Sequence, residues 1–155
     1  TGWYRGRIYQ FEGGPSVAET VGSACAGTLS RAPRIGLRPI SLGSSPTPNG
    51  SRVTLSGADP GMLSLLVLGL RQAAHPVDLS PFGFVGCSLL PDVLEVGVLI
   101  AGTQGLEAGY AHHDFQRGFA SSTSLGLTVV GQWIVLGSAA NWPGGTSATL
   151  RWKLQ

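Results

Sequence analysis

The sequence predicts an all-β protein: a two-sheet antiparallel β-sandwich of about seven to nine strands, preceded by an N-terminal extension strand. Three observations support this class. Only 12% of the 155 residues are charged, against about 25% in an ordinary soluble domain, so the charged faces that helices need are scarce. The chain holds 24 Gly and 10 Pro. These residues separate short runs of strand formers, a spacing typical of a sandwich.

A flexible break at Gly13-Gly14-Pro15 is expected to divide the chain into an N-terminal extension (1–15) and a sandwich domain (16–155). The extension reads TGWYRGRIYQFEGGP and is too apolar to remain in water. We take it as a candidate donor strand. The side chains expected to be buried are Trp3, Tyr4, Ile8, Tyr9 and Phe11.

Runs of strand formers follow one another through the domain. They lie at 34–43, 51–57, 61–71, 82–90, 92–102, 105–113, 125–137 and 146–154. The first two flank a Pro-rich loop that ends in Asn49-Gly50, a favoured hairpin dipeptide. The run 61–71 is apolar on both faces and is expected at the centre of a sheet. The last run alternates apolar and polar residues, which predicts one solvent-facing side.

Two local patterns add detail to this order. Thr103-Gln104 separates the runs 92–102 and 105–113, which predicts a hairpin between them. The segment 113–122 is the one helical candidate, a turn or two that bridges strands.

Cys25 and Cys87 are the two cysteines of the chain. In a cytosolic protein such a pair would more often be two free buried thiols. In a secreted β domain it would form one disulfide. The missing initiator Met and the scarcity of charge lead us to expect an exported chain whose signal peptide has been removed, which favours the disulfide.

Several ordered motifs carry a resemblance to a known module. They are GSACAGTL, VTLSGADPGMLSLLVLGL, VDLSPFGFVGCSLLPDVL, GQWIVLGSAANWPGG and ATLRW. Over residues 21–155 the chain resembles an uncharacterised secreted β-sandwich module common in planctomycete and myxobacterial extracellular proteins. The resemblance implies secretion, an all-β fold, a non-catalytic role and a pairing of Cys25 with Cys87. The chain departs from the family pattern at Gly137, where Asp is usual, and in the stretch YAHHDFQRGF.

The sequence lacks the motifs of the common enzyme classes. His112-His113-Asp114 is the one cluster of metal-ligand side chains, but neighbouring residues on a strand point to opposite faces, so the two imidazoles are not expected to share a metal. No serine stands in a nucleophile elbow and no phosphate-binding loop is present. We therefore expect no enzyme activity, no metal and no cofactor.

Charge and aromatic residues bear on the partners. The net charge is +2 and the cations are not clustered, so nucleic-acid binding is not expected. No apolar run reaches the ~20 residues that span a bilayer. Trp133 and Trp152 are expected in the core. Trp142, in the loop SAANWPGG, is the candidate for an exposed ligand contact, with surface polysaccharide as its candidate partner.

These observations favour a secreted structural protein. We expect a subunit of an extracellular, pilus-like filament, a homopolymer in which the N-terminal strand adds to the sheet edge of a neighbouring subunit. The alternative is a monomeric secreted adhesion, carbohydrate-binding or anchoring module. Packing of the extension on its own domain remains open beside donation to a neighbour.

Overall fold

The computed structural model describes residues 18–41, 43–44, 50–102, 107–116, 127–138 and 142–153, and these form eleven strands and one short 3-10 helix. The all-β prediction is confirmed, with more strands than the seven to nine expected. The elements are β1 (Glu19–Val21), β2 (Arg34–Ile40), β3 (Gly50–Ser56), β4 (Leu63–Gly69), β5 (Gln72–Asp78), η1 (Ser80–Phe82), β6 (Ser88–Pro91), β7 (Glu95–Ile100), β8 (Ala111–Gln116), β9 (Thr128–Leu136), β10 (Gly144–Thr146) and β11 (Thr149–Lys153). The predicted donor strand lies outside the described residues.

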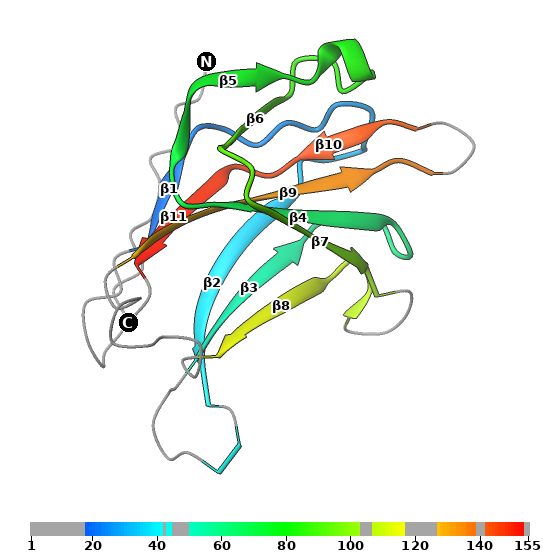
Figure 1. Ribbon diagram of the computed structural model, residues 1–155. Helices are drawn as coiled ribbons and strands as arrows, with labels where there is room; N and C mark the ends of the chain where they lie inside the picture. The colour runs from blue at the N-terminus through cyan, green and yellow to red at the C-terminus, as the bar shows by residue number, and fades with distance from the viewer. Residues whose placement is uncertain are drawn as a thin grey trace.

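The larger sheet has six strands in the order β1-β11-β9-β4-β7, with β10 also paired to β9 (Figure 1). All its pairings are antiparallel. β4 and β9 occupy the middle because both are apolar on both faces, as predicted for the run 61–71. β11 follows the predicted alternation of buried and exposed side chains at Leu150, Arg151, Trp152 and Lys153. Thr149, expected on the solvent-facing side, is buried instead.

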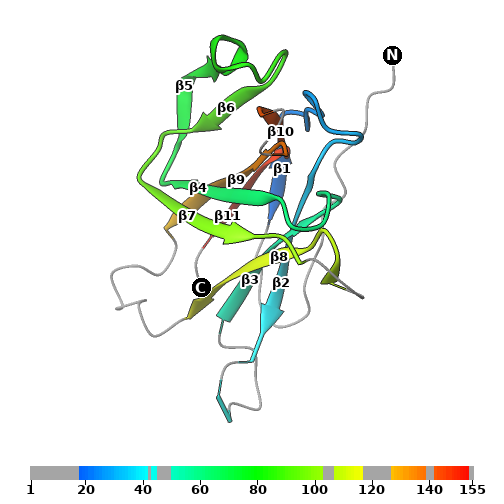
Figure 2. The same cartoon turned by 90° about the vertical axis from the view of Figure 1, so that its right-hand side faces the viewer.

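The smaller sheet consists of β2, β3 and β8, and it forms the second layer of the sandwich (Figure 2). The predicted pairing of the first two runs is confirmed, since β2 and β3 pair in register from Arg34–Ser56 to Ile40–Gly50. Two expectations are wrong. β7 pairs with β4 and not with β8, so Thr103-Gln104 joins different sheets and not the arms of one hairpin. In the helical candidate 113–122, residues 113–116 continue strand β8 and are not helical, and residues 117–122 lie outside the described residues.

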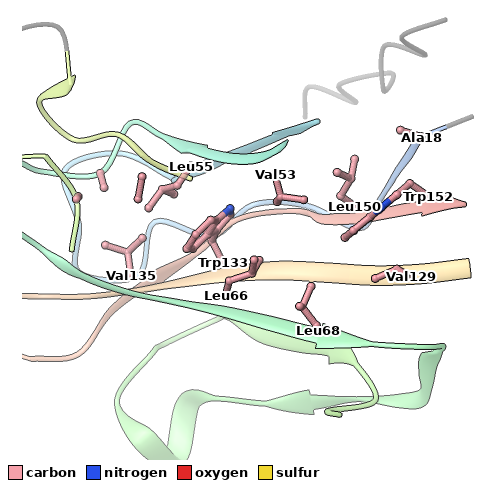
Figure 3. Packing of buried hydrophobic residues seen from close by; sticks show 13 residues of the cluster. Ala18, Val53, Leu55, Leu66, Leu68, Val129, Trp133, Val135, Leu150 and Trp152 are labelled. Atoms are coloured by element: carbon pink, nitrogen blue, oxygen red, sulfur yellow. The ribbon is translucent and has the colours of Figure 1, made fainter. Parts of the chain in front are cut away.

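The core fills the space between the two sheets (Figure 3). Trp133 lies at its centre, fully buried, and its indole N–H donates to the carbonyl oxygen of Thr54 in the opposite sheet at 3.2 Å. Trp152 packs above Gly131, where a Cβ would lie 3.1 Å from the indole ring. Glycine in this central strand therefore makes room for the second tryptophan. Burial of both rings was predicted from the sequence.

Strands β5 and β6 form a separate two-stranded ribbon. In Figure 1 the ribbon stands over the outer face of the larger sheet, away from β2, β3 and β8. Leu79, Phe84 and Cys87 pack there against Ile134 and Leu136 of β9 in a second apolar cluster. The ribbon thus covers the outer face along β9 but leaves the β7 side open.

Candidate functional site

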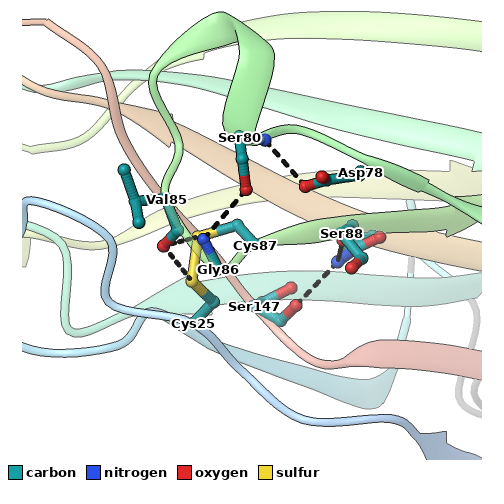
Figure 4. Close-up of a disulfide and its surroundings, with 9 residues drawn as sticks. Cys25, Asp78, Ser80, Val85, Gly86, Cys87, Ser88 and Ser147 are labelled. Carbon is teal, nitrogen blue, oxygen red and sulfur yellow. Dashed lines mark hydrogen bonds between the residues drawn. A yellow bond between two sulfur atoms is a disulfide. The ribbon is translucent and has the colours of Figure 1, made fainter.

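Cys25 and Cys87 form a disulfide, which confirms the predicted pairing (Figure 4). Cys25 follows β1 and exchanges two backbone hydrogen bonds with Thr146, at 2.7 and 2.8 Å. Cys87 is buried in the ribbon cluster. The bond therefore fastens the ribbon to the segment that follows β1. Such bonds are typical of oxidising compartments.

A buried glutamine fixes the same ribbon to the larger sheet. Gln132 of β9 is fully buried, and its amide makes three hydrogen bonds. Its Oε1 accepts from the N–H of Leu90 at 3.0 Å, while its Nε2 donates to the carbonyl oxygens of Ser88 at 2.9 Å and Ser147 at 3.0 Å. The side-chain amide of Gln132 and the backbone groups of Leu90, Ser88 and Ser147 that it contacts therefore all have hydrogen-bond partners. A polar residue in an otherwise apolar strand was the signal available in the sequence, and the sequence analysis did not use it.

The tip of the ribbon carries exposed apolar side chains. Phe82 and Val85 are each 71% exposed, and Trp142, the predicted ligand contact, is 54% exposed. Gly83, which follows Phe82, lies so near Pro143 that a Cβ on it would be 2.9 Å from the proline ring. Because Pro143 follows Trp142, this contact brings the two loops that carry Phe82 and Trp142 together. We call Phe82, Val85 and Trp142 the tip patch. The sequence analysis singled out Trp142 but missed the other two.

A second apolar surface lies along β7, the last strand of the larger sheet. Val96, Val98 and Ile100 lie on one face of this strand and are 46%, 65% and 68% exposed. Within the described part of the chain, β7 is paired on one side alone, to β4. Branched apolar side chains on an unpaired edge are uncommon, because such an edge invites pairing with another chain.

The direction of the free backbone groups on β7 follows from the ladder with β4. Ala101 N–H donates to the carbonyl oxygen of Met62 at 2.9 Å, in register with the pair Ile100–Leu63. Antiparallel ladders alternate between bonded and non-bonded pairs. The backbone N–H and C=O groups of Leu99, Gly97 and Glu95 therefore face β4. The N–H and C=O groups of Val96, Val98 and Ile100 face away from it. We call these three residues the free edge.

A groove of about 290 Å³ adjoins the free edge where the chain passes from β7 to β8. It is lined by Val98 and Ile100 of β7, by Tyr110 and His112, and by Glu107, which lies beside Gly102. The ion pairs formed among the described residues do not involve Glu107. The lining of the groove therefore combines aliphatic side chains with one acidic residue.

The predicted cluster His112-His113-Asp114 lies on β8. His112 packs beside Tyr110 with ring centroids 5.8 Å apart, and His113 packs against Phe115 at 4.7 Å. The imidazoles occupy opposite faces of the strand, as predicted. Asp114 is held by both guanidinium nitrogens of Arg52 at 2.6 Å. These hydrogen bonds lower the pKa of Asp114 below its ordinary value. Among the described residues no three His, Cys, Asp or Glu side chains are grouped as a metal site would require.

No protein-family model matches the chain, and comparisons with curated proteins and with solved structures give no match. Nowhere in the ranges that the structure describes is there a helix long and apolar enough to cross a bilayer.

Proposed function

We propose that the chain is a secreted, non-enzymatic structural subunit that polymerises by donating residues 3–12 to a neighbouring copy, forming an extracellular filament. The observation that carries the proposal is the free edge of β7, where backbone groups that no described strand pairs and exposed aliphatic side chains occur at the same three residues. An added strand satisfies both at once, because main-chain hydrogen bonds provide affinity and side-chain contacts provide register.

Two further observations support the proposal. The first 12 residues hold five large apolar side chains, which need burial, and Gly13-Gly14-Pro15 lets the segment leave its own domain. The disulfide Cys25–Cys87 suits a protein that works outside the cell, where thiols are oxidised. A head-to-tail contact between identical copies produces a filament when its rotation does not close a ring.

Deletion of residues 1–14 tests the proposal. The intact chain should sediment as concentration-dependent oligomers, and electron microscopy of negatively stained samples should show filaments. The truncated chain should remain folded and monomeric by circular dichroism and sedimentation velocity. A synthetic peptide of residues 1–14 should bind it. The proposal fails if the intact chain stays monomeric at every concentration, or if the truncated chain assembles equally well.

The tip patch favours one second candidate, a monomeric module for adhesion, carbohydrate binding or anchoring. Exposed aromatic rings such as Phe82 and Trp142 offer flat apolar faces on which sugar rings stack. Titration with polysaccharides, followed by tryptophan fluorescence, tests this candidate. Trp142→Ala should abolish the response. Leu127→Ala, an exposed apolar side chain outside the patch, should leave it intact.

A further inference from the structure

We infer that the acceptor for residues 3–12 is the free edge of β7 in the neighbouring subunit, entered antiparallel with Arg5 beside Glu107. This inference rests on the proposed strand donation and adds the site, direction and register of the contact. It follows from the character of the sheet edges, the reach of the chain, and the pattern of charged and apolar residues in the segment.

The two sheets of the sandwich end in four described edge strands, β1, β7, β2 and β8, and three of them carry features that discourage pairing. β2 contains Arg38 and Pro39, and proline cannot donate to a ladder. β1 has three residues, and its Glu19 is held in an ion pair with Arg151. β8 carries an ion-paired Asp114 beside its histidines. β7 instead offers three exposed aliphatic residues in alternation, so it is the edge best suited to accept an apolar strand.

Residues 13–18, which connect the segment to β1, are too short for the segment to reach β7 of its own domain, so the contact joins two subunits. β1 lies at one edge of the larger sheet and β7 at the other, four strand spacings apart (Figure 1). A strand added outside β7 lies one spacing further, so at about 4.8 Å per spacing a straight line from β1 to it is roughly 24 Å long and passes through packed strands. The six residues 13–18 reach at most about 21 Å when fully extended. A path around the sandwich is longer, so the segment cannot lie along β7 of its own domain.

The charges and the position of the groove together favour one direction. Arg5 and Arg7 stand near the start of the segment, whereas Tyr9 and Phe11 follow them. Glu107 lines the groove beside Gly102, just beyond the last residue of β7. Glu95 places a carboxylate at the first residue of β7 as well, so an arginine meets an acidic residue in either direction, but the groove that can enclose the Arg5 side chain adjoins the Glu107 end. The segment therefore runs antiparallel to β7.

One register places Arg5 beside Glu107 and both aromatic residues beside the valines of the free edge. With Arg5 opposite Gly102, Arg7 lies opposite Ile100, Tyr9 opposite Val98 and Phe11 opposite Val96. Aromatic residues beside β-branched residues are favourable cross-strand neighbours. Ile8 then points to the other face, opposite Leu99, which packs against the core between the sheets. The same register would bring Glu12 opposite Glu95, so the pairing ends at Phe11.

Two substitutions at one position test the backbone contact in the full chain. Val98→Pro removes the outward N–H that the added strand needs, while the ladder to β4 uses the neighbouring residues. Val98→Thr keeps that N–H and is the matched control. We expect Val98→Pro to raise the concentration needed for assembly by at least about tenfold, and Val98→Thr by less than about threefold. Thermal unfolding of each variant shows whether the domain is intact.

Cross-linking tests the register without relying on the proline variant. One full-length chain carries Tyr9→Cys and a second carries Val98→Cys, so a mixed disulfide can form only between subunits. We expect rapid cross-linking of this pair. The control replaces Val98→Cys by Val77→Cys, at an exposed valine on the ribbon, and should cross-link at the background rate. Glu107→Arg should weaken assembly about two- to fivefold, and Arg5→Glu in the same chain should restore it.

The outcomes separate the two claims. If assembly requires residues 1–14 but Tyr9→Cys fails to cross-link to Val98→Cys, strand donation stands and the β7 acceptor is wrong. The same conclusion follows if a folded Val98→Pro variant assembles normally. If the intact chain never oligomerises, both claims are overturned.

Discussion

Replacing Gln132 by Met removes three hydrogen bonds, of which those to Ser88 and Leu90 hold the ribbon to the larger sheet, while a side chain of similar length still fills the space. The backbone groups of Ser88, Leu90 and Ser147 then lose their buried partner. At about 1 kcal/mol for each hydrogen bond, the free energy of unfolding should fall by about 3 kcal/mol. For a chain of this size the loss corresponds to a fall in Tm of about 9 °C.

Urea unfolding followed by tryptophan fluorescence measures this change, because Trp133 lies at the centre of the core. Hydrogen exchange at the Leu90 amide reports whether the ribbon opens locally, and this amide should exchange faster in the variant. Gln72→Met is the control, since Gln72 is exposed at the start of β5 and its loss should change stability by less than about 0.5 kcal/mol. A Gln132→Met variant as stable as the parent, with Leu90 equally protected, would refute the assigned role.

Three further predictions concern stability. Asp114→Asn should cost about 1 kcal/mol at neutral pH, because the carboxylate and the Arg52 side chain are 27% and 24% exposed and joined by two hydrogen bonds. The Arg52 hydrogen bonds depress the pKa of Asp114 in the folded state, so this contribution is complete above the unfolded pKa of about 4 and is lost as the pH falls below it. Urea titrations of parent and variant should therefore converge toward pH 2. Thr149→Val should stabilise the fold by about 1 kcal/mol in the same assay, since its buried hydroxyl has no hydrogen-bond partner in the described structure. Changing both Cys25 and Cys87 to Ser should remove roughly 4 kcal/mol, because the bond closes a loop of 62 residues; a loss below about 1 kcal/mol would contradict this.

The sequence predicted the elements whose pattern is local. The apolar run that became β4 had to be buried on both faces, and the alternation of Leu150 and Trp152 with charged residues indicated one wet face. Two cysteines in a β domain expected to be exported indicated the disulfide. For the two strands the neighbouring residues alone carry the information, because side-chain period and burial are linked. The disulfide followed instead from the number of cysteines and the expected compartment.

The missed features depend on contacts between distant residues. β5 contains Pro76 and is exposed at nearly every position, since as one arm of a ribbon it has no buried face to mark with alternation. The turn signal after β7 marks where the chain bends, but it does not specify the partner of the next strand, and β8 joined β3 instead. Gln132 acquires its role from Ser88 and Leu90, more than forty residues away in sequence.

The disulfide changes how a filament of such subunits would respond to pulling. Tension would enter each subunit through residues 1–17, which join β1, and leave through β7 at the opposite edge of the same sheet. Seven residues separate Ala18 from Cys25, and eight separate Cys87 from Glu95. If the strands of the larger sheet separate under load, the path from Ala18 to Glu95 through the disulfide is fully extended at about 50 Å. Without the disulfide, the backbone from Ala18 to Glu95 could extend to about 270 Å. An oxidised filament is therefore expected to stiffen early under load, and a reduced one to stretch several times further before it resists.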